Sequence, residues 1–270
     1  MDNGVCGIAP YEIRKIILEQ SKRANVGHIG SALSVADIIA ALYGGAMKTA
    51  KDKDPERDRF VLSKGHAALA LYAALYLKGY ISRKELDTFC GEGSRLGVHP
   101  ESCLSCVDFS TGSLGQGLSM AAGAALAARL QNSPRRVFAL LSDGECNEGS
   151  VWEAAMFAAH HKLSNLIAVL DLNAQQAFGY TEDVLSLSPM AARWRAFNWD
   201  VHEIDGHDIN AIQALIGRLS SAPGSRPHIL VARTVFGKGV PFMENKIKWH
   251  YWPMSDEEYR QALDAVRESA

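Results

Sequence analysis

Two short apolar runs on either side of a helical stretch constrain the fold more than any other feature of this sequence. Val137–Leu141 (VFALL) and Leu166–Leu170 (LIAVL) contain only apolar residues, and Ser150–His161 between them has the spacing of a helix. Continuous apolar runs of this length are typical of strands buried on both faces of a parallel sheet. Because short links join the strand, the helix and the next strand, the pattern predicts a right-handed βαβ unit.

The alternation of strands and helices continues toward the C-terminus. Val201–Ile204 and Ile229–Ala232 are predicted strands, and the predicted helix Ile209–Leu219 separates them. The expected fold class is therefore α/β, a single doubly wound and mostly parallel sheet with helices on both faces, with residues 1–270 forming one domain. Apolar spacing predicts further helices over Tyr11–Lys22, Ala67–Lys78, Gly117–Leu130 and Asp256–Glu268.

Three local patterns have simple structural interpretations. Ser34 followed by Asp37 resembles a capping box that opens a helix through Tyr43. The charged run Lys48–Arg59 (KTAKDKDPERDR) is expected to be a solvated surface loop. Met156 and Phe157, on a predicted helix, are expected to belong to the core.

Composition excludes several classes of protein. The chain has 28 Lys and Arg against 30 Asp and Glu, a net charge of −2, so we expect neither nucleic acid nor an anionic membrane as a partner. The longest uncharged stretch, Phe109–Ala128, is diluted by Gly, Ser, Thr and Gln, so we do not expect a membrane span. Five cysteines, an odd number, argue against a disulfide framework, and the N-terminus lacks a signal-peptide pattern. These features predict a cytoplasmic protein.

Oxygen-bearing side chains follow both strands of the predicted βαβ unit. Asp143 comes directly after the first apolar run, and Asn173 follows the second. Ligands of open α/β sheets collect at the carboxyl ends of the strands, which meet at one edge. Carboxylate and amide oxygens suit Mg²⁺ or Ca²⁺, and Gly144 lets the backbone approach a phosphate. The spacing is consistent with a metal–diphosphate site, although a turn and an ordinary loop asparagine would also explain it.

Further motifs run through nearly the whole chain. They are GHIGS (27–31), DRFVLSKGHAALALYAAL (58–75), GVHPE (97–101), STGSLGQGLSMAAG (110–123), SDGECNEGSVWEA (142–154), HHKLSNLIAVLDLN (160–173), IDGHDI (204–209), TVFGKGV (234–240) and KWH (248–250). Together and in this order, they resemble the N-terminal, thiamine-diphosphate-binding half of transketolase. The resemblance implies thiamine diphosphate and a divalent cation (Mg²⁺, or Ca²⁺ or Mn²⁺) as cofactors, and ketol transfer from a ketose donor to an aldose acceptor as the reaction.

The resemblance also implies roles for individual residues. The cation is assigned to Asp143, Asn173 and the backbone carbonyl of Gln175. Cofactor binding is assigned to His66, Gly112, Ser113, Leu114, Gly144, Glu148, Asn173 and His250. The implied catalytic residues are His28, His66, His99 and His250, of which His28 and His99 line the substrate channel. Imidazole suits a reaction that moves protons to and from sugar hydroxyls near neutral pH. For His207, in DGHD, a turn or capping role is expected instead.

Two departures from the family pattern lead to further expectations. His250 is followed by Tyr251 and Trp252, two bulky aromatic residues, so we expect a sugar other than the usual pentose phosphates. The pyrimidine-binding domain of the family is absent from these 270 residues. We therefore expect it on a C-terminal transketolase subunit, with the two chains forming a heterotetramer of two plus two. The alternatives are a 1-deoxyxylulose 5-phosphate synthase-like carboligase and a non-catalytic cofactor-binding subunit.

Overall fold

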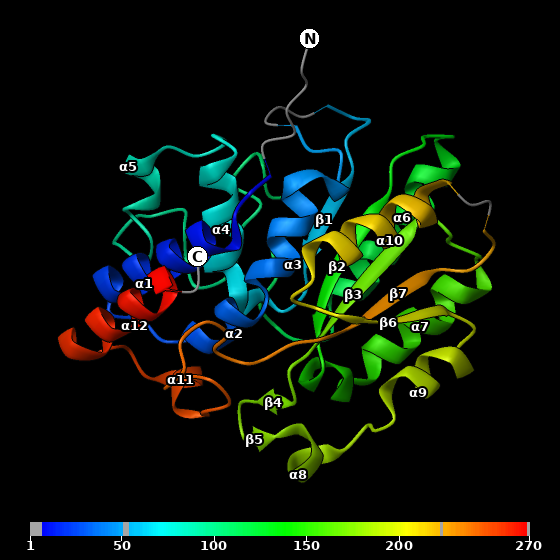
Figure 1. Ribbon diagram of the computed structural model, residues 1–270. Helices are drawn as coiled ribbons and strands as arrows, with labels where there is room; N and C mark the ends of the chain where they lie inside the picture. The colour runs from blue at the N-terminus through cyan, green and yellow to red at the C-terminus, as the bar shows by residue number, and fades with distance from the viewer. Residues whose placement is uncertain (1–6, 51–53, 222–223, 269–270) are drawn as a thin grey trace.

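Five parallel strands form the centre of the computed structural model, which describes residues 7–50, 54–221 and 224–268 (Figure 1). The strands lie in the order β1-β2-β3-β7-β6, and every neighbouring pair is parallel. The predicted parallel α/β sheet is therefore confirmed. The bounds are β1 (Arg59–Leu62), β2 (Val137–Ser142), β3 (Leu166–Leu172), β6 (Asp200–Asp205) and β7 (His228–Arg233).

Helices cover both faces of the sheet, and each face has its own apolar core. Along β2, Phe138 and Leu140 pack into one core, whereas Val137, Ala139 and Leu141 pack into the other. Successive strand residues point to opposite faces, so a strand buried on both sides must be apolar throughout. This explains why the runs at 137–141 and 166–170 do not alternate with polar residues.

The two helical layers are visible on either side of the sheet in Figure 1. The first core is shared by α1 (Pro10–Ala24), α2 (Ile29–Ser34), α3 (Ala36–Ala41), η1 (Leu42–Ala46), α4 (Ala68–Leu77), α5 (Arg83–Leu86), α10 (Ile209–Ser221), α11 (Lys248–Tyr251) and α12 (Asp256–Glu268). The second core is shared by α6 (Gly117–Leu130), α7 (Gly149–His160) and α9 (Met190–Ala196).

Short elements gather at the edge where the parallel strands end. The hairpin of β4 (Gln175–Gln176) and β5 (Gly179–Tyr180) follows β3 directly, and α8 (Thr181–Leu185) follows the hairpin. In Figure 1, this hairpin and α11 both lie below the sheet. Two 3₁₀ turns, η2 (Gly65–Ala67) and η3 (Gly144–Asn147), come directly after β1 and β2 at the same edge. Segments far apart in the sequence therefore meet there.

Most predicted elements are present, and some predicted ends are correct to the residue. The helix at Gly117–Leu130 and the helix at Asp256–Glu268 have the predicted bounds. The unpredicted elements are strand β1 and the short elements α2, α5, β4, β5, α8, α9 and α11. Each is only two to seven residues long, which is too short to establish a period in the sequence.

The predicted capping box is wrong. Ser34 is the last residue of α2, and α3 begins at Ala36 without a side-chain cap. The Ser34 hydroxyl instead donates a hydrogen bond to Asp171, 2.8 Å away. The Asp37 carboxylate forms an ion pair with Arg14. Partners that are distant in the sequence therefore displace the local capping interaction.

Two expectations about exposure are also wrong. In the charged run, of which residues 51–53 lie outside the described residues, Arg57 and Asp58 are buried, because Arg57 forms an ion pair with Asp108 and Asp58 with Arg136. Met156 and Phe157 are 53% and 40% exposed rather than part of the core. They lie on the outer side of α7, whose inner side carries Val151, Ala154, Ala155 and Ala158.

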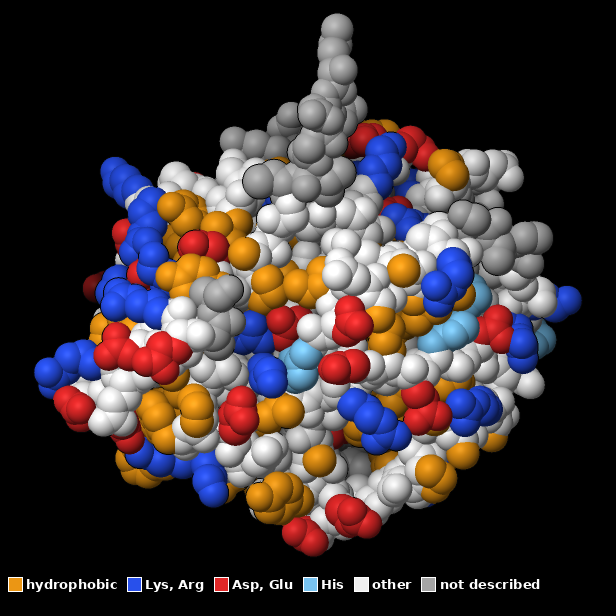
Figure 2. Space-filling model, viewed as in Figure 1, with side chains coloured by type: hydrophobic (Ala, Val, Ile, Leu, Met, Phe, Trp, Pro, Cys, Tyr) orange, Lys and Arg blue, Asp and Glu red, His pale blue; other side chains and the backbone are white. Residues whose placement is uncertain are grey.

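The surface carries charges of both signs. Acidic and basic side chains are interspersed across the face shown in Figure 2, as the net charge of −2 leads one to expect. Within the described ranges, no helix combines the length and the apolar character needed to cross a membrane.

Candidate active site

Asp143 and Asn173 meet at the carboxyl ends of β2 and β3, as predicted. One Asp143 carboxylate oxygen accepts a hydrogen bond from the Gly144 N–H (2.8 Å), and the other accepts one from the Ala174 N–H (2.7 Å). The Asn173 Oδ1 accepts a hydrogen bond from the Gln175 N–H (2.9 Å). The turn at residues 173–175 therefore holds both side chains, which are almost completely buried.

The oxygens at this edge have the properties of a cation site. Burial and the nearby Asp171 raise the pKa of Asp143 to about 7, because the site places negative charges together away from water. The buried Gln175 Oε1 has no hydrogen-bond partner among the described residues. A Cβ on Gly144 would lie 2.7 Å from the Cβ of Gln176, so only glycine fits there. A divalent cation would relieve the excess of oxygen acceptors at this edge.

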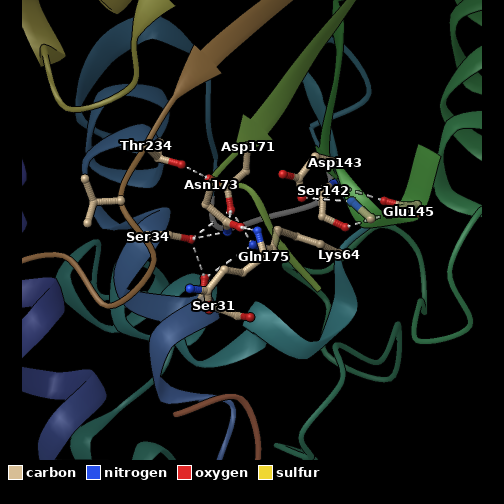
Figure 3. A network of polar contacts seen from close by, with 12 residues as sticks. Ser31, Ser34, Lys64, Ser142, Asp143, Glu145, Asp171, Asn173, Gln175 and Thr234 are labelled. Atoms are coloured by element: carbon tan, nitrogen blue, oxygen red, sulfur yellow. Dashed lines mark hydrogen bonds and ion pairs between the residues drawn. The ribbon is translucent and has the colours of Figure 1, made fainter. Parts of the chain in front are cut away.

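A buried ion pair, which we did not predict, lies next to these residues (Figure 3). Lys64 and Asp171 form a salt bridge, and their side chains are only 1% and 0% exposed. The Asp171 carboxylate also accepts hydrogen bonds from Ser34, Asn173 and Thr234. Lysine in SKGH and aspartate in LDLN are more than 100 positions apart, so sequence periodicity gave no sign that they pair.

A second buried carboxylate holds the turn at residues 112–115. Glu145 accepts hydrogen bonds from the Ser63 hydroxyl and from the Gly115 N–H (2.8 Å). The turn is tightly packed, because a Cβ on Gly65 would lie 2.9 Å from the Gly112 nitrogen. Burial raises the pKa of Glu145. Its role was not predicted either, since in the sequence it is one of several acidic residues in SDGECNEG.

Glu148 lies beside the same turn. It is exposed and occupies the N-cap position of α7. Its Cβ lies so close to Gly115 that a Cβ added to that glycine would be only 2.6 Å away. The turn predicted to hold a diphosphate (Gly112, Ser113 and Leu114) is therefore followed directly by Gly115, which lies against Glu145 and Glu148. It also lies against His99, whose ring would be 3.2 Å from a Cβ on Gly112.

Three of the four predicted catalytic histidines form a triangle. The ring centroids of His28, His66 and His250 are 5.4–5.5 Å apart. The Nδ1 atoms of His28 and His250 are buried without a partner among the described residues, so both could bind a ligand. His99 lies close enough to His28 and His66 to influence their ionisation.

The histidine triangle is kept neutral by its surroundings. Burial, together with the neighbouring His28 and Lys64, lowers the pKa of His250 to about 4. Burial and then Lys64 hold the pKa of His66 well below its usual value, and burial and His99 lower the pKa of His28. A neutral imidazole carries one donor and one acceptor, the form required to take a proton from a hydroxyl group.

Two glycines make the triangle possible. A Cβ on Gly27 would overlap the backbone of Tyr251, and a Cβ on Gly30 would overlap the ring of Phe236. The Phe236 ring is in turn stacked on His250 at an interplanar angle of 11°. The His28 N–H donates a hydrogen bond to the His250 carbonyl oxygen (3.3 Å). The GHIG motif thus brings α2 close to the segment that carries His250.

His207 has a structural position outside the triangle. Its Nδ1 lies 2.6 Å from the Asp37 carboxylate, and its Nε2 accepts a hydrogen bond from the Val235 N–H (2.9 Å). His207 therefore links α3 to the loop that carries Phe236, which extends the turn or capping role expected for it.

The geometry at this edge has counterparts in known proteins. Residues 9–266 match the family model described as transketolase, thiamine diphosphate binding domain. The chain belongs to the transketolase family. The resemblance of the sequence to the thiamine-diphosphate-binding half of transketolase is therefore confirmed. Transketolases are transferases.

Relatives of similar length are named as transketolase subunits. A 6-deoxy-6-sulfo-D-fructose transketolase subunit from Clostridium sp. (strain MSTE9) is 42% identical over 254 residues, which are 93% of this chain and 92% of that protein. An apulose-4-phosphate transketolase subunit from Phocaeicola vulgatus is also 42% identical, over 94% of this chain and 91% of that protein.

Other relatives are much longer. Human transketolase is 35% identical over 92% of this chain, but the match spans only 40% of the human protein. The crystal structure of transketolase from Campylobacter jejuni superposes with a TM-score of 0.88 at 30% identity, covering 99% of this chain and 43% of that chain. This chain therefore has the thiamine-diphosphate-binding fold found within the longer transketolases.

We predict that Gly30→Ala destabilises this transketolase chain and disturbs its histidine triangle. The new methyl group would overlap Phe236, which must move and release the ring stacked on it, His250. Overpacking of this kind typically costs about 1–3 kcal/mol of unfolding free energy, measurable by urea denaturation. The matched control is Gly123→Ala, since a Cβ there would meet nothing within 4 Å in the middle of α6. The control is expected to be neutral or stabilising.

We also predict that the histidine triangle makes the fold sensitive to acid. The folded-state pKa of His250 is about 4, below the ordinary value of 6.5. The unfolded chain therefore binds more protons between these values, so stability is complete above about pH 6.5 and is lost as the pH falls toward 4. Replacing His250 with Gln should reduce the loss of unfolding free energy between pH 7 and pH 5 by about 1–2 kcal/mol.

Denaturation at both pH values checks this prediction. His160→Gln is the control, because His160 is exposed at the end of α7 and should leave the loss unchanged. An equal pH dependence in wild type and His250→Gln would contradict the prediction.

Proposed function

We propose that this chain is the cofactor- and metal-binding subunit of a two-subunit, thiamine-diphosphate-dependent transketolase. The observation that carries the proposal is the meeting of two different groups at one sheet edge. Buried carboxylate and amide oxygens lie around Asp143, and neutral imidazoles whose Nδ1 atoms have no partner among the described residues lie at His28 and His250. The first group suits a cation with a diphosphate, and the second suits sugar hydroxyls.

We propose the following residues for the metal and the diphosphate. The Asp143 carboxylate, Asn173 Oδ1 and the Gln175 carbonyl would hold Mg²⁺, Ca²⁺ or Mn²⁺. No group of three or more His, Cys, Asp or Glu side chains within the described ranges is placed to hold a metal. Such a site would therefore depend on amide, carbonyl and phosphate oxygens. Gly144, Glu148 and the turn of Gly112, Ser113 and Leu114 would complete the cofactor site, together with His66 and His250.

The histidines would act on the sugar. Thiamine diphosphate, when bound, supplies the electron sink for cleavage of the carbon–carbon bond. His28 and His99 would bind the hydroxyls next to the carbonyl that is attacked, and His66 and His250 would lie between the diphosphate and the sugar. Since burial keeps the imidazoles of the triangle neutral at pH 7, they can accept a hydroxyl proton and return it later in the reaction.

A C-terminal transketolase subunit is the proposed partner. The relatives of matching length are named as subunits, and the longer transketolases contain more than twice the part that this chain matches. We propose that residues 1–270 form the diphosphate-binding domain, and that the partner supplies the pyrimidine-binding domain in a heterotetramer of two plus two. A cytoplasmic location is also proposed, and the free thiols of Cys90, Cys103, Cys106 and Cys146 support it.

Co-expression of this chain with the product of the neighbouring reading frame tests the proposal. The pair should co-purify, bind thiamine diphosphate with Mg²⁺, and transfer a ketol unit when phosphorylated and unphosphorylated sugars are supplied. Either chain alone should be inactive. Full turnover by this chain alone would refute the need for a partner, and consumption of pyruvate with release of carbon dioxide would favour the synthase-like alternative.

We further propose that Tyr251 and Trp252 alter the choice of sugar. The Tyr251 ring lies 5.2 Å from the His250 ring, and its hydroxyl donates a hydrogen bond to the Ala177 carbonyl in the β4–β5 hairpin. Trp252 is 63% exposed beside it. Two relatives are named for sulfofructose and apulose 4-phosphate, which are not the usual pentose phosphates.

The expected result is slow turnover of xylulose 5-phosphate with ribose 5-phosphate and a clear preference for another sugar pair. Trp252→Ala should change the ratio of kcat/KM between the preferred pair and the pentose pair by about tenfold, the effect of about 1.4 kcal/mol. Leu130→Ala is the control, since Leu130 is also exposed but lies at the far end of α6, before β2 begins. Fastest turnover with the pentose phosphates would contradict this prediction.

A further inference from the structure

The orientation of the Asn173 amide decides whether this residue can bind a cation. The two ends of an asparagine side chain have nearly the same shape, but only the oxygen end accepts, and the NH₂ end can only donate. Metal ions of the Mg²⁺ type bind oxygen ligands. A fold that uses this asparagine as a ligand therefore has to distinguish the two ends.

The structure contains a group that makes this distinction. Asn173 Nδ2 lies 2.9 Å from Asp171 Oδ2 and 3.3 Å from the Ser34 hydroxyl oxygen, both in a position to accept its hydrogen bonds. Asn173 Oδ1 points the other way, toward the turn whose Ala174 N–H is bound to Asp143. An ionised carboxylate only accepts hydrogen bonds, so the group that faces it must be a donor.

Asp171 is itself held in place. Its Oδ2 accepts hydrogen bonds from Lys64 and Ser34 besides the one from Asn173, and its Oδ1 accepts one from Thr234. Lys64 is 1% exposed and supplies the buried positive charge that the carboxylate needs. Reversing the Asn173 amide would place its oxygen against this carboxylate and leave its NH₂ group facing the Gln175 N–H.

We infer that Asp171 is a positioning residue that fixes the Asn173 amide with its oxygen toward the cation. The inference rests on the proposed function, because it takes Asn173 as a cation ligand. It adds that a residue outside the ligand set, on the strand itself, determines how that ligand binds. The Lys64–Asp171 pair then acts on the metal through the Asn173 side chain.

The experiment measures binding of Mn²⁺, by electron paramagnetic resonance, to the chain assembled with its partner at saturating thiamine diphosphate. Asp171→Asn should weaken Mn²⁺ binding by at least about tenfold, the usual effect of losing a group that orients a metal ligand. Because Lys64 would lose its counter-charge, the same variant is expected to be less stable. A second pair of variants therefore separates orientation from folding.

Asn173→Asp provides that separation. A carboxylate at position 173 presents oxygen to the cation in either orientation, and Asp171→Asn would turn the contact between its inner oxygen and residue 171 into a hydrogen bond. Asp171→Asn should therefore cost at least about tenfold in the Asn173 background and less than about threefold in the Asn173→Asp background, a coupling that a double-mutant cycle measures. An equal cost in both backgrounds would overturn the inference and make Asp171 purely structural.

Thr234→Val is the matched control. It removes a donor to the other oxygen of Asp171 and leaves the contacts of Asn173 in place. It should lower the melting temperature but leave Mn²⁺ affinity unchanged, and a loss equal to that of Asp171→Asn would count against the inference.

If the wild-type assembly bound neither Mn²⁺ nor thiamine diphosphate, the proposed function would fail. If Asp171→Asn bound Mn²⁺ as well as wild type, only this inference would fail.

Discussion

A buried ion pair between Lys64 and Asp171 holds the candidate site together. Removing two charges from water costs several kcal/mol per ion, and the attraction between them compensates only if the remaining hydrogen-bonding positions are filled. Here they are filled from four segments, because the acceptor oxygens of Asp171 meet Ser34 of α2, Lys64 after β1, Asn173 after β3 and Thr234 after β7. The charge pair thus ties the ends of three strands to a helix (Figure 3).

The two halves of the site differ in electrostatic character, and burial is the main cause in both. On one side, burial and then the nearby Asp171 carboxylate raise the pKa of Asp143, so that side favours a cation. On the other side, His28, His66 and His250 are kept neutral by burial, by neighbouring imidazoles and, for the last two, by Lys64. Lys64 belongs to both halves, since it neutralises Asp171 and also disfavours protonation of His66 and His250.

Most of the fold could be predicted because periodicity is a local property. The runs at β2 and β3 were apolar throughout, and α6 and α12 had helical spacing over more than three turns, so their positions were correct. β1 and the β4–β5 hairpin are too short for a period. The local sequence predicts a capping box at Ser34, but the Ser34 hydroxyl is bound to Asp171, which is 137 positions away.

The order of residues along the chain was enough to establish the α/β class, the meeting of Asp143 and Asn173 at one edge, and, through the motifs, the transketolase family and the four candidate histidines. The meeting of Asp143 and Asn173 follows from strand order, because a parallel sheet brings its strand ends to the same edge, whereas the family and the histidines follow from the resemblance of the motifs. Which side chains pair at that edge became known only from the folded molecule. Three sets of contacts there join residues that are distant in the sequence. They are the Lys64–Asp171 ion pair, the hydrogen bond from the Gly115 N–H to Glu145, and the close packing of Gly27 on Tyr251 and of Gly30 on Phe236. Such contacts depend on the shape and charge of the packed interior, which a single sequence does not reveal until the chain is folded.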